Sequence, residues 1–108
     1  ENAATLGAYA LARLNDMKGR LGVIGDVRGR GFLMGVELVM DKQGKEPAVD
    51  LAEDVLYRCL SGGLSFKISM GNTLTLTPPL VVTKDQMDQA LDVLERAITD
   101  AARAARLA

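Results

Sequence analysis

The stretch that decides the fold of this chain is Thr73-Leu74-Thr75-Leu76-Thr77-Pro78-Pro79-Leu80. Threonines and leucines alternate with period 2, so the leucines point to one face of a strand and the threonines to the other. Proline has no backbone N–H donor, so the strand is expected to end at Pro78 and Pro79. The strand therefore has one apolar and one polar face, and what the polar face contacts is the functional question.

The residues before this strand predict its hairpin partner. Apolar and polar residues alternate from Leu64 to Met70, which predicts a strand with Leu64, Phe66, Ile68 and Met70 on its apolar face. The pair Gly71-Asn72 then predicts a tight hairpin into the leucine–threonine strand. Both strands of the hairpin therefore carry a polar face.

Two more strands are predicted between Gly22 and Val39, where β-forming residues and glycines dominate. The glycine-rich run at residues 28–31 predicts the bend or bulge that joins them. In the second strand, alternation separates two faces: Phe32, Met34, Val36 and Leu38 on one, and Leu33, Gly35, Glu37 and Val39 on the other.

Three segments have the apolar spacing of amphipathic helices. The first begins near Ala3 and ends near the stop signal at Gly19. The second has Pro47 in its first turn, and Gly62-Gly63 supply a left-handed C-terminal cap. The third begins at Thr83, because Thr83-Lys84-Asp85-Gln86 has the form of a capping box.

These elements follow one another in the order αββαββα within a single domain, residues 1–108. The simplest way to bury their apolar faces is an α+β fold, in which an antiparallel sheet has helices on one face. The opposite, polar face of the sheet is left without a partner.

Composition excludes several classes of function. The chain is 48% hydrophobic and 25% charged with a net charge of −1, which is typical of a globular protein rather than one that binds a membrane or nucleic acid. It has no histidine, which excludes a His-containing triad or zinc site and disfavours catalysis by this chain alone. The lone Cys59 is predicted to lie in the core, gives no support for secretion and agrees with a cytoplasmic protein.

Three candidate sites have simpler interpretations. The run at residues 25–31 resembles a phosphate loop, but Met34 stands where a dinucleotide fingerprint needs glycine, so a bend is favoured. Lys67 is interpreted as a solvated or interface charge rather than a Schiff-base nucleophile. Asp26 and Glu37 are interpreted as ordinary strand-edge charges rather than an acid–base pair.

Four segments of the chain carry a resemblance to a known family. They are residues 24–39, residues 59–64, residues 76–80 and the helix that opens at Thr83. Together they resemble the C-terminal small domain of class III pyridoxal-phosphate-dependent aminotransferases. The first segment, with Glu46-Pro47-Ala48, is especially similar to the dialkylglycine decarboxylase branch, and 4-aminobutyrate and other omega-aminotransferases are close alternatives.

The resemblance implies a fold type I enzyme, usually a cytoplasmic homodimer, that moves an amino group between an amino donor and a keto acid. A larger preceding domain would bind pyridoxal 5'-phosphate, so no catalytic or cofactor-binding residue is assigned to this chain. As a fragment it is then expected to be inactive, and its share would be to shape the substrate entrance and close the active site. The alternatives are a lyase or decarboxylase on the same cofactor, or a free-standing, non-catalytic binding or dimerisation module.

One residue departs from the family pattern. The family places a carboxylate-binding arginine three residues before the first proline of the Pro-Pro-Leu motif, and here that position is Thr75. Thr75 is therefore the predicted substrate-binding residue, but it cannot form the charged, bidentate fork of an arginine. Either the substrate has no α-carboxylate, or its carboxylate is held elsewhere, or the register of the hairpin is shifted. The polar sheet face that carries Thr75 is predicted to face the large domain and the mouth of the active site.

Overall fold

The computed structural model describes residues 2–30, 33–76 and 83–107. It confirms the predicted α+β fold and the order αββαββα. The elements are α1 (Asn2–Arg20), β1 (Ile24–Arg30), β2 (Leu33–Leu38), α2 (Val49–Ser61), β3 (Lys67–Ser69), β4 (Thr73–Leu76) and α3 (Lys84–Ala104). The strands form one sheet in the order β1-β2-β4-β3, and each neighbouring pair is antiparallel.

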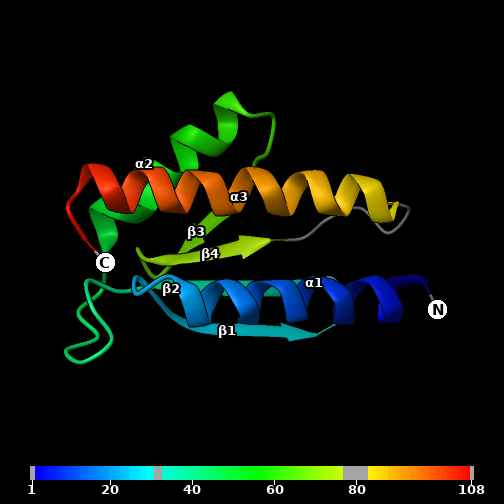
Figure 1. Cartoon of the computed structure of the whole chain (residues 1–108), viewed down its shortest axis with the longest axis horizontal. Coiled ribbons are helices and arrows are strands. Elements are labelled where there is room, and N and C mark those ends of the chain that lie inside the picture. Colours follow the sequence, from blue (N-terminus) through cyan, green and yellow to red (C-terminus); the bar gives the residue numbers. More distant parts are fainter. Residues whose placement is uncertain (1, 31–32, 77–82, 108) are drawn as a thin grey trace.

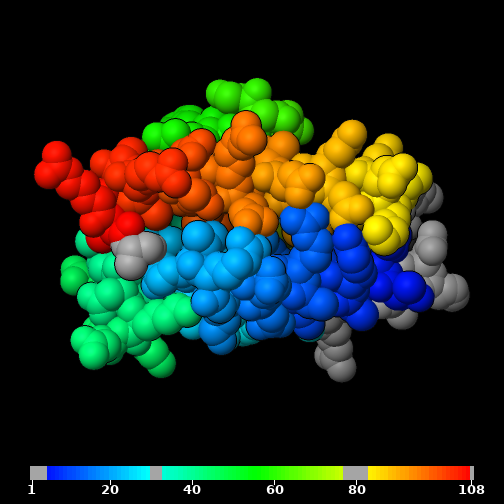
Figure 2. All heavy atoms as spheres, viewed as in Figure 1, coloured from blue at the N-terminus to red at the C-terminus, as the bar shows by residue number. Residues whose placement is uncertain are grey.

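The helices form a layer on one face of the sheet. Helices α1 and α3 run side by side, with α2 next to α3 (Figure 1). Their side chains form a continuous surface on this side of the molecule (Figure 2). None of the helices in the described ranges combines the length and the apolar composition that a membrane span requires.

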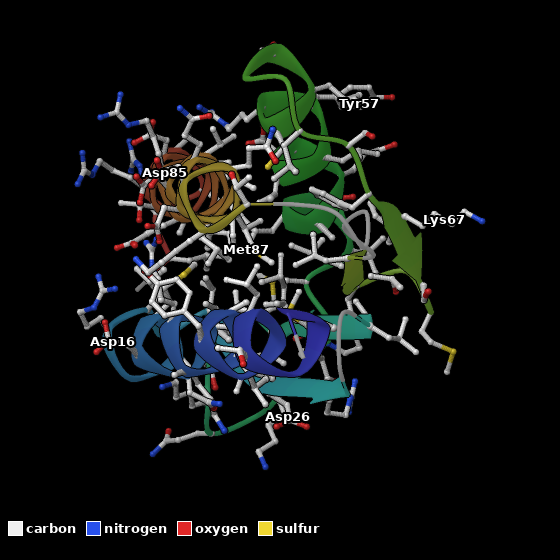
Figure 3. All side chains as sticks on the ribbon, turned by 90° about the vertical axis from the view of Figure 1, so that its right-hand side faces the viewer. Asp16, Asp26, Tyr57, Lys67, Asp85 and Met87 are labelled. Atoms are coloured by element: carbon white, nitrogen blue, oxygen red, sulfur yellow. The ribbon has the colours of Figure 1, made fainter. Side chains whose placement is uncertain are left out.

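The core lies between the helical layer and the apolar face of the sheet. Met87 occupies the space between α1, α3 and the sheet (Figure 3) and is almost completely buried. Leu74 of the leucine–threonine strand is fully buried, as its alternation predicted. Cys59 is also buried, and this burial raises the pKa of its thiol to about 11. The prediction that Cys59 is a core residue is confirmed.

Both predicted helix caps are present. The backbone N–H of Gln86 donates to Thr83 Oγ1 (3.1 Å), and the Thr83 N–H donates to the side chain of Gln86 (2.9 Å), which completes the capping box. Helix α2 ends in a Schellman motif around Gly63, whose φ is 89°. There the Leu64 N–H donates to the Cys59 carbonyl (2.8 Å). Local sequence therefore sets these boundaries.

The hairpin differs from its prediction in length and in one side chain. Lys67 pairs with Thr75 and Ser69 with Thr73, which leaves a three-residue connection instead of a tight two-residue turn. Met70 belongs to this turn with a φ of 57°, and its side chain is 91% exposed. The prediction that Met70 lies on the apolar face is wrong, because the strand ends one residue before it.

The first strand pair contains a bulge inside β1 that was not predicted from the sequence. The register of β1 against β2 shifts between Ile24 and Asp26, so the irregularity lies at Gly25. Gly29 lies inside the strand, while residues 31–32 and the prolines at 78 and 79 lie outside the described residues.

Val39 and Pro47 pair with each other between β2 and α2. Val39 is buried, follows the last residue of β2 and forms an isolated bridge with Pro47. Helix α2 begins only at Val49, so the prediction that Pro47 lies in its first turn is wrong.

Charged side chains join α1 to α3 along the edge of their contact. Arg13 of α1 bonds Asp88 (3.3 Å) and Asp92 (3.0 Å) of α3. The Tyr9 hydroxyl also donates to Asp88, and this hydrogen bond is the main reason that the pKa of the Asp88 carboxyl lies below its usual range.

Removing the Tyr9 hydroxyl should therefore destabilise the domain in a pH-dependent way. Because the pKa of Asp88 is lower in the folded than in the unfolded state, ionised Asp88 stabilises the fold at pH values above its unfolded-state pKa. This contribution is lost as the pH falls through the folded-state pKa. We expect Tyr9→Phe to lower the urea midpoint at neutral pH and to differ less from wild type at about pH 3, below the ordinary Asp pKa. A matched control is Tyr57→Phe, because Tyr57 is exposed and its hydroxyl bonds none of the described residues. A pH-independent effect of Tyr9→Phe would contradict the assignment.

Candidate functional site

The face of the sheet opposite the helices, here called the outer face, carries the predicted site. Strand register places Thr75 opposite Gly35 of β2 on one side and Lys67 of β3 on the other. Lys67 points away from the helical layer (Figure 3). Residues that the register places on this face include Asp26, Arg28, Leu33, Gly35, Glu37, Lys67, Ser69, Thr73 and Thr75.

Thr75 lies near the middle of the outer face and is partly exposed. Its hydroxyl is 2.9 Å from the hydroxyl of Ser69 on the neighbouring strand, and either group can donate this hydrogen bond. The neighbouring Thr73 is buried, although it lies on the same face. No described helix covers Thr75, so its side of the sheet is open to contact another part of a larger protein.

A shallow hollow of about 420 Å³ lies beside Thr75. The hollow exists because Gly35 has no side chain, so no side-chain atoms fill the centre of the outer face between β1 and β4. The hollow is lined by Arg28, Gly29, Leu33, Met34, Gly35, Thr73 and Thr75. Leu33 at its rim is 58% exposed and gives this otherwise polar face an apolar contact.

The carboxylates of the outer face lie together and are bound by cations. Asp26 and Glu37 are register partners, a proximity that their separation in the sequence did not reveal. Arg28 Nη1 lies 3.2 Å from an Asp26 oxygen and 3.9 Å from a Glu37 oxygen, and Lys18 Nζ lies 3.7 Å from Asp26. The set forms an ion-pair cluster on the β1–β2 side of the face, in agreement with their interpretation as structural charges.

The described residues do not fit a pyridoxal phosphate site of their own. A Schiff-base lysine needs an enclosed amino group whose pKa is lowered by its surroundings. Lys67, the lysine next to Thr75, is exposed on an open face. Within the described ranges there is also no group of three acidic, histidine or cysteine side chains that could hold a metal ion.

Comparison with known proteins identifies the family. The family model of class III aminotransferases matches residues 1–98. A leucine/methionine racemase of Thermococcus litoralis is 46% identical over 93% of this chain, and an (R)-1-hydroxy-2-aminoethylphosphonate ammonia-lyase of Vibrio splendidus is 50% identical over 84%. The matches cover 23% and 19% of those two proteins, so the chain spans about a fifth to a quarter of their length.

Solved structures agree with this result. The structure of a transaminase from a marine Virgibacillus superposes with a TM-score of 0.88 at 28% identity, over 96% of this chain and 25% of the transaminase chain. The chain belongs to the class III aminotransferase family, whose members have the fold type I architecture and use pyridoxal phosphate.

Proposed function

We propose that this chain is the C-terminal small domain of a pyridoxal-phosphate-dependent transaminase and that its outer face closes over the active site. The observation that carries the proposal is the position of Thr75: it lies on the one sheet face that the described helices leave open. The family match and the coverage of about a quarter of a solved transaminase support it.

In this proposal the cofactor is bound by a larger domain of the same enzyme and supplies the chemistry that labilises bonds at the carbon bearing the amino group. The residues of this chain bind and orient the substrate. Thr75 and Ser69 offer hydroxyl groups beside the hollow, and Leu33 offers an apolar contact at its rim. Docking of the outer face would also exclude water from the reaction, so the 108-residue chain alone is expected to be inactive.

A second candidate reaction on the same cofactor is ammonia elimination or racemisation. The similarity to an ammonia-lyase and to a racemase favours it, and aminotransferases occur among the relatives as well. Homodimerisation and a cytoplasmic location remain predictions.

The full-length enzyme should show a visible cofactor absorption band that shifts when an amine is added. Incubation of each amine with and without a keto acid then separates the reactions: a new amino acid indicates transamination, free ammonia indicates elimination, and inversion of a chiral donor indicates racemisation. A protein that carries no cofactor and produces none of these changes would favour the non-catalytic module.

Replacing Thr75 with arginine should restore the carboxylate-binding fork of the family. We expect Thr75→Arg to raise kcat/KM for carboxylate-bearing donors roughly tenfold, as for a new hydrogen bond to a charged group, with no gain for uncharged amines. Thr75→Gln is the matched control, because it adds length and polarity without charge. Equal responses of Arg and Gln variants would contradict the placement of Thr75 at the substrate carboxylate position.

A further inference from the structure

Gly35 is a strand glycine whose small size the described chain itself does not require. Glycine in the middle of a strand costs stability, because it loses more backbone freedom on folding than other residues and has no side chain to pack. A Cβ atom at Gly35 would lie 3.6 Å from Thr73 Cγ2, an ordinary contact distance, and its φ is not in the left-handed region. At Gly25 and Gly29, the other glycines of the described strands, a Cβ atom would lie 2.7 Å and 3.0 Å from a neighbouring side chain. Among these three, only Gly35 has no steric reason to be glycine within the described residues.

The missing side chain of Gly35 leaves the hollow at the centre of the outer face. Gly35 pairs with Arg28 on one side and with Thr75 on the other, so it lies between β1 and β4 and not at an edge of the sheet. Leu33, two residues earlier in β2, leaves the same face and is 58% exposed at the rim. None of the described residues fills this space. A group from outside the described residues can therefore approach β2 closely here.

The groups around the hollow favour an apolar occupant over an ion. The Arg28 guanidinium already lies against two carboxylates of its own face, so its charge is balanced. The Thr75 hydroxyl is hydrogen-bonded to its neighbour on β3. The side chain of Leu33 and the Cγ2 methyl of Thr73, in contrast, offer hydrocarbon toward the space above Gly35. Covering this hydrocarbon with an apolar side chain removes it from water and stabilises the contact.

The chain outside this structure supplies a source for that side chain. This chain covers 25% of the solved transaminase chain and 23% of the Thermococcus litoralis racemase, so most of each of those proteins lies outside the matched part. Under the proposed function the outer face lies against a larger domain of the same enzyme. That domain is therefore the occupant that the length of the relatives favours.

We propose that the larger domain of the same polypeptide seats an apolar side chain in the hollow over Gly35, against Leu33, whether or not substrate is bound. The proposal rests on the proposed function, which places the outer face against that domain. It adds that protein, and not substrate, occupies the β2 side of Thr75. It also explains why position 35 carries no side chain.

The first test identifies the occupant directly. Leu33 is replaced with its photoreactive diazirine analogue in the full-length holoenzyme, the enzyme is irradiated without substrate, and mass spectrometry locates the crosslink. We expect an intramolecular crosslink to an apolar residue of the larger domain. A crosslink to a second copy, which would double the mass of the product, would overturn the proposal. So would a crosslink only within residues 1–108, or reaction with water alone.

The second test fills the hollow from this side of the contact. Gly35→Leu should abolish the crosslink from position 33 and lower the melting temperature of the full-length holoenzyme, because the new side chain takes the space of the seated one. Gly19→Leu is the matched control, since it makes the same change at an exposed helix position where a Cβ atom meets nothing within 4 Å. It should leave the crosslink intact. An unchanged crosslink in the Gly35→Leu enzyme would mean that the hollow is not where the larger domain packs.

The two proposals fail separately in these experiments. An enzyme that forms the expected crosslink but reacts with no amine would contradict the proposed function and leave the packing contact in place. An enzyme that transfers amino groups but gives no crosslink to its larger domain would overturn the packing contact alone.

Discussion

Leu14→Ala should lower the free energy of unfolding of this chain by about 2–5 kcal/mol, the usual cost of truncating a fully buried leucine. Leu14 has no exposed surface and belongs to the core between the helices and the sheet. The substitution removes apolar atoms from the core and leaves a cavity that the surrounding helix and strands can fill only in part. Urea unfolding followed by circular dichroism measures the loss.

Leu33→Ala is the matched control for this prediction. It makes the same chemical change at a residue of β2 that is 58% exposed on the outer face. We expect a change within about 0.5 kcal/mol, as for most surface substitutions. Similar losses for the two variants would mean that the burial of Leu14 does not contribute to stability as the structure indicates.

The sequence predicted those features of the fold that depend on neighbouring residues. The capping box at Thr83 and the glycine cap of α2 are set within a few positions along the chain, and both are present. The alternation of leucine and threonine in β4 also predicted that Leu74 and Leu76 are buried, because the residues on the apolar face of a strand recur with period 2. It did not predict that Thr73, on the opposite face, is buried as well.

Features that depend on how strands meet could not be predicted. Met70 continues the apolar alternation of its segment, but the pairing of Ser69 with Thr73 ends the strand before it. Similarly, the glycines at positions 25 and 29 are indistinguishable as bend signals until the register of β1 against β2 places the bulge at Gly25. The sequence showed which residues could end a strand or form a bulge, and the pairing of the strands determined which of them do so.

The same limit applies to the candidate site. Thr75 was identified by its distance from the proline pair and by its polar face, both of which are local. Its nearness to Ser69 and Lys67 comes from the hairpin register, and the pairing of Asp26 with Glu37 comes from that of β1 and β2. Lys67 was recognised as a residue of a polar strand face, and the hairpin register adds that it lies opposite Thr75.

Gly25→Ala should be the most damaging single-methyl addition among the glycines of the first strand. A Cβ atom at position 25 would lie 2.7 Å from Val39 Cγ1, closer than side-chain carbons approach one another, and Val39 is itself buried. Its φ is not in the left-handed region, so the constraint on Gly25 is space rather than backbone conformation. Overpacking of this kind costs about 1–3 kcal/mol, measurable by urea unfolding.

Gly29→Ala provides the matched comparison for Gly25, because it makes the same change on the same strand. There the nearest atom is the Cδ1 methyl of Leu11, at 3.0 Å, the end of a partly exposed side chain that can rotate away. We therefore expect a smaller loss than for Gly25→Ala. Val39→Ala should remove most of the Gly25→Ala penalty in the double variant, because the two closest atoms at position 39 are its γ-methyl groups. Additive losses in this double-mutant cycle would contradict the steric explanation and would locate the need for glycine in the bulge itself.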